Sequence, residues 1–236
     1  MKILWKVGAG LLVLFLLCVP EVFAWPVPDT GQTKCYDNTA EIPCPASWQP
    51  FYGQDAQYQG PTRSYTKQGQ NGVALADTAT QESGWLMTRD NATGLVWEMK
   101  TDDNSIHGAN KTFFWCDRNT ATNGGNQGAC STGTGNASTD TEAFIKAIND
   151  DHFGGFNDWR LPSIKEIFSL INSSIPPPGP TIDAAWFPLT LPFYYWSSTT
   201  SAGNTSSAWR VNFYVGSGGS DSKSSGYNVR AVRAGH

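Results

Sequence analysis

The sequence predicts an α+β fold in which two helices pack on a twisted antiparallel sheet with long irregular loops. Two observations support this fold class. Strand-like segments precede a pair of helix-like segments, and further strand-like segments, separated by clusters of Gly, Ser and Asn, follow them. Because the helical segments lie between the two groups of strands, we expect them to cover one face of a single sheet.

The first strands are expected at residues 85–89 and 95–99, where aromatic and aliphatic side chains dominate. Residues 90–94 between them have a turn composition, and Gly94 can adopt a positive φ. These segments therefore predict a hairpin. A long polar segment follows at residues 102–136, and such segments in compact domains are usually functional or disordered.

The helices are predicted from capping residues and apolar spacing. The first opens at residues 139–142 (Thr-Asp-Thr-Glu), and Phe144, Ile145 and Ile148 form its apolar stripe. The second begins at Ser163, where a glutamate three residues later makes a capping box. The apolar residues that follow at helical spacing are Ile164, Ile167, Phe168, Leu170 and Ile171. The three prolines at 176–178 end any helix there.

The last third of the chain has the pattern of strands. Candidates lie at residues 193–199, 208–215 and 227–232. Within the second, aromatic or apolar side chains alternate with polar ones, which is strand periodicity with one buried face. The inward residues would be Trp209, Val211 and Phe213, and the outward ones Arg210, Asn212 and Tyr214.

The N-terminus predicts export. Lys2 and Lys6 precede an apolar run over residues 7–19, and Val22 and Ala24 place small residues at the two positions that a signal peptidase reads. Residues 1–24 are therefore interpreted as a secretory signal. An uncleaved anchor and a lipid on Cys18 are the alternatives, but the run is short and a bulky leucine precedes that cysteine. Residues 25–84 are then an irregular disulfide-stapled arm, and residues 85–236 are the folded domain.

The charge balance argues against one class of partner. The full chain has a net charge of −4. Removal of the signal takes away two lysines and one glutamate, which leaves about −5, so nucleic acid is not expected as a partner. The chain contains no second long apolar run, so the mature protein is expected to have no membrane span.

Four cysteines remain outside the signal: Cys35, Cys44, Cys116 and Cys130. An even number in an exported chain predicts two disulfides, with three pairings open. The local pairing Cys35–Cys44 and Cys116–Cys130 is favoured because each pair brackets a short polar loop. Zinc is the competing interpretation, but there is no CxxC spacing and no flanking histidine.

No catalytic pattern accompanies these features, so no enzymatic activity is expected. The sequence lacks a nucleophile elbow and a phosphate-binding loop after a strand. His152 is expected to cap a helix end, and Arg160 to pair with a carboxylate in the core, Glu98 being the candidate. No cofactor is expected other than Ca²⁺, for which Asp102, Asp103 and Asn104 offer hard oxygen ligands on one loop. A solvated turn is the competing interpretation of that loop.

Several motifs, in order, resemble one known family. They are Thr93-Gly94-Leu95-Val96-Trp97-Glu98, Asp158-Trp159-Arg160-Leu161-Pro162-Ser163-Ile164-Lys165-Glu166, Tyr195-Trp196-Ser197-Ser198-Thr199, Ala208-Trp209-Arg210-Val211-Asn212-Phe213 and Val229-Arg230-Ala231-Val232-Arg233. Together they resemble the C-terminal domain of collagen-like adhesins (the Lcl C-terminal domain family). The resemblance implies a C-type-lectin-like fold related to the formylglycine-generating enzymes, and a surface or secreted bacterial adhesin. The late reactive cysteines of those enzymes are missing, because no cysteine follows Cys130.

The tail suggests where a ligand would bind. Between residues 212 and 228 the outward and loop positions are mostly Tyr, Ser, Gly, Asn and Asp, the palette of antibody binding loops. The expected ligand-facing residues are Tyr214, Ser217, Ser220, Asp221, Ser222, Ser225, Tyr227 and Asn228. A Ser/Gly-rich loop chosen only for turns and solubility is the competing interpretation.

These observations predict a secreted, surface-exposed or periplasmic recognition protein. It would bind a glycan or surface polymer, or another surface protein, through the face built by the last strands and their loops. The alternative is a structural protein that self-assembles, as a possible homo-oligomer, in the cell envelope or outside the cell.

Overall fold

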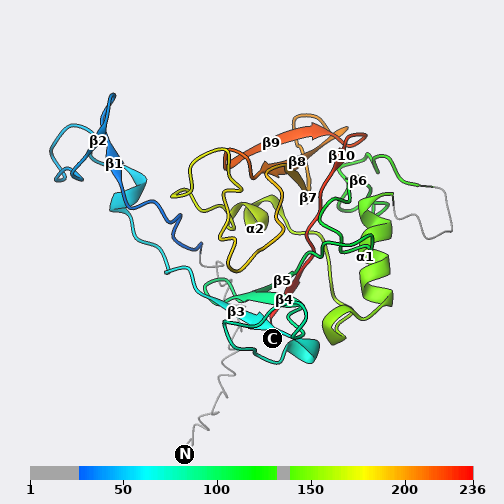
Figure 1. Ribbon diagram of the computed structural model, residues 1–236. Helices are drawn as coiled ribbons and strands as arrows, with labels where there is room; N and C mark the ends of the chain where they lie inside the picture. Colours follow the sequence, from blue (N-terminus) through cyan, green and yellow to red (C-terminus); the bar gives the residue numbers. More distant parts are fainter. Residues whose placement is uncertain (1–26, 132–138, 236) are drawn as a thin grey trace, which may run out of the picture.

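The computed structural model describes residues 27–131 and 139–235 (Figure 1). The expected signal sequence lies outside the described residues. The described chain forms four small antiparallel sheets, two short α-helices and three single-turn 3₁₀ helices. The 3₁₀ helices are η1 (Asp55–Gln57), η2 (Gln70–Gly72) and η3 (Phe153–Gly155).

The largest sheet joins the two ends of the folded domain. Its strands, in spatial order, are β11 (Val232–Ala234), β5 (Leu95–Glu98), β4 (Met87–Asp90) and β3 (Tyr65–Gln68). The predicted hairpin at residues 85–99 is confirmed, with Gly94 at a φ of 76° in its turn. The C-terminal chain runs from the upper sheet of Figure 1 down to this sheet, which therefore contains strands from both halves of the sequence.

The second sheet carries the tail of the chain. It consists of β7 (Tyr194–Thr200), β8 (Ser207–Asn212) and β9 (Ser217–Ser222), in that order. Two strand pairs complete the set: β6 (Phe113–Phe114) with β10 (Gly226–Tyr227), and β1 (Cys35–Tyr36) with β2 (Glu41–Ile42) in the extended arm. Figure 1 shows β1 and β2 set apart from the main body.

The predicted α+β arrangement of two helices packed on one sheet is wrong. The protein is β-rich, and α1 (Thr141–Asp150) and α2 (Ile164–Phe168) contact different elements. Helix α2 packs on β7, β8 and β9, whereas α1 packs on β6 and η3. The apolar spacing after Ser163 predicted a helix that extends past Phe168, where α2 ends. Leu170 and Ile171 are buried, but they lie in the turn that follows the helix.

The helix starts follow their capping signals. Asp140 accepts a hydrogen bond from the backbone N–H of Ala143, and Ser163 and Glu166 form the predicted capping box. Such caps satisfy N–H groups that have no partner inside the helix. Arg160 forms a bidentate ion pair with Glu166, with N–O distances of 2.8 and 2.6 Å. Arg160 therefore pairs with Glu166 at the surface rather than with Glu98 in the core.

Two buried clusters hold the sheets together. One, around Trp97, joins the largest sheet to α2 and to the β7–β8 pair, and the other, around Trp115 and Trp196, lies beneath α1. Trp97, Trp159 and Trp196 are at most 2% exposed. Trp209, which was predicted to face inward, is 36% exposed and stands opposite Ser220 of the edge strand β9.

A charged group sits inside this core. The carboxylate of Glu98 is fully buried and accepts hydrogen bonds from Lys100 Nζ at 2.9 Å and the backbone N–H of Ala231 at 2.9 Å, and its Oε1 lies 2.8 Å from His107 Nδ1. Burial alone would raise the pKa of Glu98, but Lys100, His107 and the Ala231 amide lower it to about 2. The group is therefore ionised and fixes the C-terminal end of β5.

Candidate functional site

Four side chains from the last strands meet on one face of the β7–β8–β9 sheet. They are Tyr194, Arg210, Asp221 and Tyr227, here called the tyrosine–arginine cluster. The Arg210 guanidinium lies 3.8 Å from the centroid of the Tyr194 ring, and the two tyrosine rings are 5.0 Å apart. The Tyr227 hydroxyl donates a hydrogen bond of 2.6 Å to Asp221 Oδ2. The cluster is thus built by four strands that are adjacent in space.

The polar groups of this cluster are only partly satisfied. The hydrogen bond from Tyr227 lowers the pKa of Asp221, so its carboxylate is ionised. Arg210 Nε lies 3.4 Å from that carboxylate, a long contact. Among the described residues, the terminal nitrogens of Arg210 have no hydrogen-bond partner. A stacked arginine with free terminal donors is well suited to bind an oxygen-rich ligand.

The predicted ligand-facing residues do not all lie on one face of the sheet. Ser217, Ser220 and Ser222 are exposed on β9, but strand alternation puts Ser217 and Asp221 on the face of the cluster and Ser220 and Ser222 on the opposite face. The remaining positions lie outside β9. Tyr214, in the β8–β9 turn, is 46% exposed, and Ser225, in the turn between β9 and β10, is partly buried.

Asn228 does not belong to an exposed face. Its side chain is 4% exposed, and its amide donates hydrogen bonds to the carbonyls of Ala109 and Lys111 at 2.9 and 2.8 Å. It therefore fastens the loop before β6 to the tail of the chain. A polar residue in a Ser/Asn-rich tail is not by itself evidence of exposure, because buried backbone carbonyls also need donors.

Two members of the cluster, Tyr194 and Arg210, were missed by the sequence-based expectation. Arg210 was placed on the outward face of its strand, and this alternation was the available signal. Tyr194 precedes two buried aromatic residues and was taken only as part of a strand. A ligand contact at either position can be predicted only when it is known which strands are neighbours.

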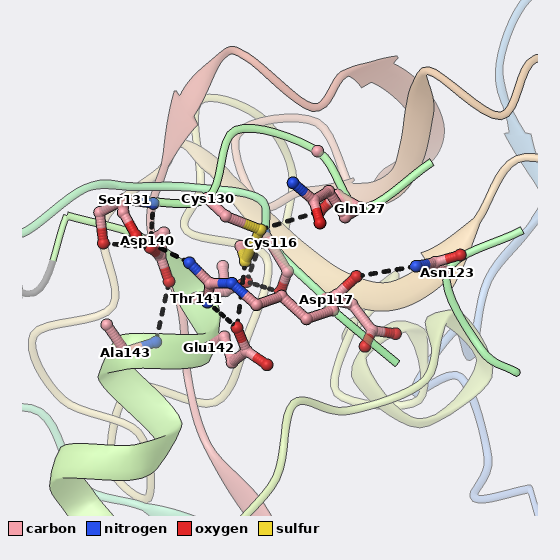
Figure 2. The surroundings of a disulfide bond; sticks show 12 residues. Cys116, Asp117, Asn123, Gln127, Cys130, Ser131, Asp140, Thr141, Glu142 and Ala143 are labelled. Carbon is pink, nitrogen blue, oxygen red and sulfur yellow. Dashed lines mark hydrogen bonds and ion pairs between the residues drawn. A yellow bond between two sulfur atoms is a disulfide. The ribbon is translucent and has the colours of Figure 1, made fainter. Parts of the chain in front are cut away.

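The predicted disulfides are confirmed. Cys35–Cys44 staples the arm, and Cys116–Cys130 closes a loop in front of α1 (Figure 2). Figure 2 shows how this loop is attached to the helix: the Thr141 hydroxyl accepts from the N–H of Cys116 and donates to its carbonyl, both at 2.9 Å. The N-cap residue Asp140 also accepts from the N–H of Ser131 at 2.7 Å. The loop and the helix start thus form one unit.

The loop proposed for calcium forms a hydrogen-bonded turn. Asp103 Oδ1 accepts from the hydroxyl of Thr101 at 2.7 Å and from the N–H of Ser105 at 2.9 Å. Hydrogen bonding from the Ser105 side chain, the Thr101 hydroxyl and the Ser105 N–H lowers the pKa of the Asp103 carboxyl. Asp102 and Asn104 are exposed neighbours. The carboxylate oxygen is therefore partly occupied by the turn, and calcium binding at Asp102, Asp103 and Asn104 stays a prediction.

Another cluster contains side chains of the types that bind metal ions. Within residues 27–131 and 139–235, Cys116, Cys130 and Glu142 form the single group of at least three such side chains close enough to share an ion. Both sulfurs are joined in a disulfide, so neither is a thiolate and the group does not fit a metal.

The buried ammonium group of Lys223 binds the loop that the Cys116–Cys130 disulfide closes. Lys223 is 2% exposed, and its ammonium donates to the carbonyls of Asn123 at 3.0 Å and Asn126 at 2.6 Å. It also lies 3.9 Å from the centroid of the Trp115 ring. Burial lowers the pKa of Lys223. Backbone carbonyls that converge on one point often bind a metal ion, and here a lysine ammonium occupies that position.

These features define a class: a disulfide-stapled, β-rich domain with an irregular arm and a polar, aromatic surface on its last strands. The family model described as the Lcl C-terminal domain matches residues 86–233, and the chain belongs to this family. Searches of curated proteins and of solved structures gave no significant match. In the part of the chain that the structure describes, no helix has the length and apolar character to cross a membrane.

Proposed function

We propose that this protein is an exported recognition and adhesion protein that binds a glycan or another surface polymer through the tyrosine–arginine cluster. The single observation that carries the proposal is Arg210, which is stacked on Tyr194 with its terminal nitrogens free of partners among the described residues. Membership of the Lcl C-terminal domain family favours a role at a surface. The two disulfides are compatible with a location outside the cytoplasm, whether extracellular, surface-bound or periplasmic.

The chemistry of the cluster suits a carbohydrate polymer. An ionised Asp221 accepts hydrogen bonds from hydroxyl groups, and an arginine fork donates to hydroxyl, carboxylate or sulfate oxygens. The half-buried tyrosines give the site a rigid apolar border. The exposed Ser217 lies on the same face of β9 as Asp221 and enlarges the contact area. No catalytic step is assigned to these groups, and we propose that the protein acts by binding.

An array of glycans and polyanions tests this proposal, with calcium and with a chelator in parallel. The variant Arg210→Ala should lose binding to the selected ligand. Arg89→Ala is the matched control, because it removes the same charge from β4, where the side chain makes no hydrogen bond within the described residues. Equal binding by both variants would contradict a role for the cluster, and loss with chelator would add a metal ion to the site.

A structural role is the second candidate. Strand β9 pairs with β8 along its full length and has no partner on its other side among the described strands. Such an edge can pair with a strand of another copy. Under this alternative the purified protein would elute as a concentration-dependent oligomer on a sizing column. Ser220→Pro would restore the monomer, because the N–H of Ser220 faces the free edge of β9 and not β8.

A further inference from the structure

A groove lies at the opposite end of the β7–β8 pair from the tyrosine–arginine cluster. It is bounded by the first turn of α1, the loop closed by Cys116–Cys130 and the turn between β7 and β8. Its volume is about 720 Å³, and none of the four cluster residues lines it. This volume lies within the range of small-molecule binding sites in proteins. The groove is therefore a separate candidate site.

Hydroxyl groups line one wall of this groove. The side chains of Ser198, Ser201 and Thr205 have no hydrogen-bond partner among the described residues, and Thr199 Oγ1 only accepts a bond from the N–H of Ile164. Each of these hydroxyls can therefore donate to a ligand, and the first three can also accept. These four residues all line the groove and bring neutral hydrogen-bonding groups to it.

The remaining surface of the groove is largely apolar. Ile145 of α1 and Leu161 are half-buried there, and Trp115 lies beneath them. The disulfide at Cys116 adds a further apolar contact beside Glu142 (Figure 2). A ligand bound here would place one apolar face against these side chains and direct its polar edge toward the hydroxyl wall.

The charged side chains at the groove are either ion-paired or hydrogen-bonded. Glu142 forms an ion pair with Arg118, and Arg160 is held by both oxygens of Glu166. Asp117 Oδ2 accepts a hydrogen bond from Thr122 at 2.6 Å, and its Oδ1 accepts from a backbone N–H. Because the arginines are neutralised by neighbouring carboxylates, the groove offers no free cation to attract an acidic ligand.

We propose that this groove is a second binding site, which takes a neutral saccharide segment. A pyranose ring has an apolar C–H face and a rim of hydroxyl groups, which matches an apolar floor beside a wall of serine and threonine hydroxyls. The site goes beyond the proposed function, because it differs from the tyrosine–arginine cluster in position and in the charge of the ligand it selects. A polymer with neutral and acidic segments could occupy both sites.

Titration calorimetry with neutral trisaccharides (maltotriose, cellotriose and N,N′,N″-triacetylchitotriose) tests the inference on the purified protein. We expect at least one to bind, and Thr205→Trp, which fills the groove, to weaken that binding by roughly tenfold or more. Thr120→Trp is the matched control: Thr120 is exposed on the same loop system, lies outside the groove and makes no side-chain hydrogen bond. It should leave binding within about twofold of the unmodified protein.

Two further variants keep the test decisive. Ala202→Trp fills the groove from the same exposed turn and replaces Thr205→Trp if that variant does not fold. Arg210→Ala should leave trisaccharide binding unchanged, so failure of the cluster and failure of the groove are distinguishable. The inference is overturned if no neutral trisaccharide binds the folded protein, or if binding survives both groove-filling variants.

Discussion

Replacement of Lys223 by methionine removes the internal cation while keeping most of the side-chain volume. In the native structure the Lys223 ammonium donates to two loop carbonyls, those of Asn123 and Asn126, and packs over the Trp115 ring. Methionine fills the space but offers no donor, so both carbonyls lose a charged partner. Asn123 is 3% exposed, so water cannot replace the donor there without opening the loop.

The magnitude follows from these contacts. Hydrogen bonds to a charged group contribute about 1.5–3 kcal/mol each, and a cation–π contact about 0.5–2 kcal/mol. The cost of burying the ammonium, which lowers the pKa of Lys223, opposes them. We expect a net loss of about 3 kcal/mol in the free energy of unfolding. For a domain of this size that corresponds to a fall of roughly 6–12 °C in Tm.

Thermal unfolding and hydrogen exchange measure this effect. Lys165→Met is the control, because Lys165 is exposed on α2 and its ammonium makes no hydrogen bond within the described residues. The Lys223 variant should also speed amide exchange in residues 117–127, since the loop loses its fastening. A Tm within about 2 °C of the control, which is under about 1 kcal/mol, would refute the argument that this lysine acts as a structural cation.

Two further predictions concern stability. Glu98 has a folded-state pKa of about 2 against an ordinary value of 4.5, so its contribution of about 3 kcal/mol is present above pH 4.5 and is lost as the pH falls toward 2. Glu98→Gln should therefore be strongly destabilised at pH 7, with a difference from the native protein that shrinks in urea titrations at pH 3; a difference independent of pH would contradict this. The double variant Cys116→Ser/Cys130→Ser opens a loop with a sequence separation of 14 and should lose about 3 kcal/mol, whereas opening Cys35–Cys44 in the exposed arm should leave the Tm of the domain nearly unchanged. Equal losses from the two bridges in thermal melts would show that the arm and the domain unfold as one unit.

The features predicted correctly from the sequence are local ones. The turn around Gly94, the capping box at Ser163 and the two short-range disulfides each depend on residues close together in the chain. His152 is a similar case: its Nδ1 lies 2.9 Å from the carbonyl of Asp150 at the end of α1, as expected for a cap. Local chemistry decides such features before any tertiary packing forms.

The features missed depend on long-range pairing. Strand β9 has the composition Ser-Gly-Gly-Ser-Asp-Ser, which has low strand propensity, and it is a strand because β8 offers it a complete ladder of partners. Strand β3 similarly lies in the segment expected to be an irregular arm, yet it pairs with β4. Long-range strand pairing also decides that Tyr194 and Arg210 meet and that the two helices pack on different elements. For this reason neither feature was predicted from the sequence.

The central claim, that the last strands form the ligand-binding face, is tested most directly by hydrogen–deuterium exchange with and without the polymer selected on the array. The account predicts slower exchange in residues 217–228 and at the start of β7, with no change in residues 27–60 of the arm. The same polymer should give no protection in the Arg210→Ala variant. Protection confined to the arm, or unchanged in that variant, would contradict the account.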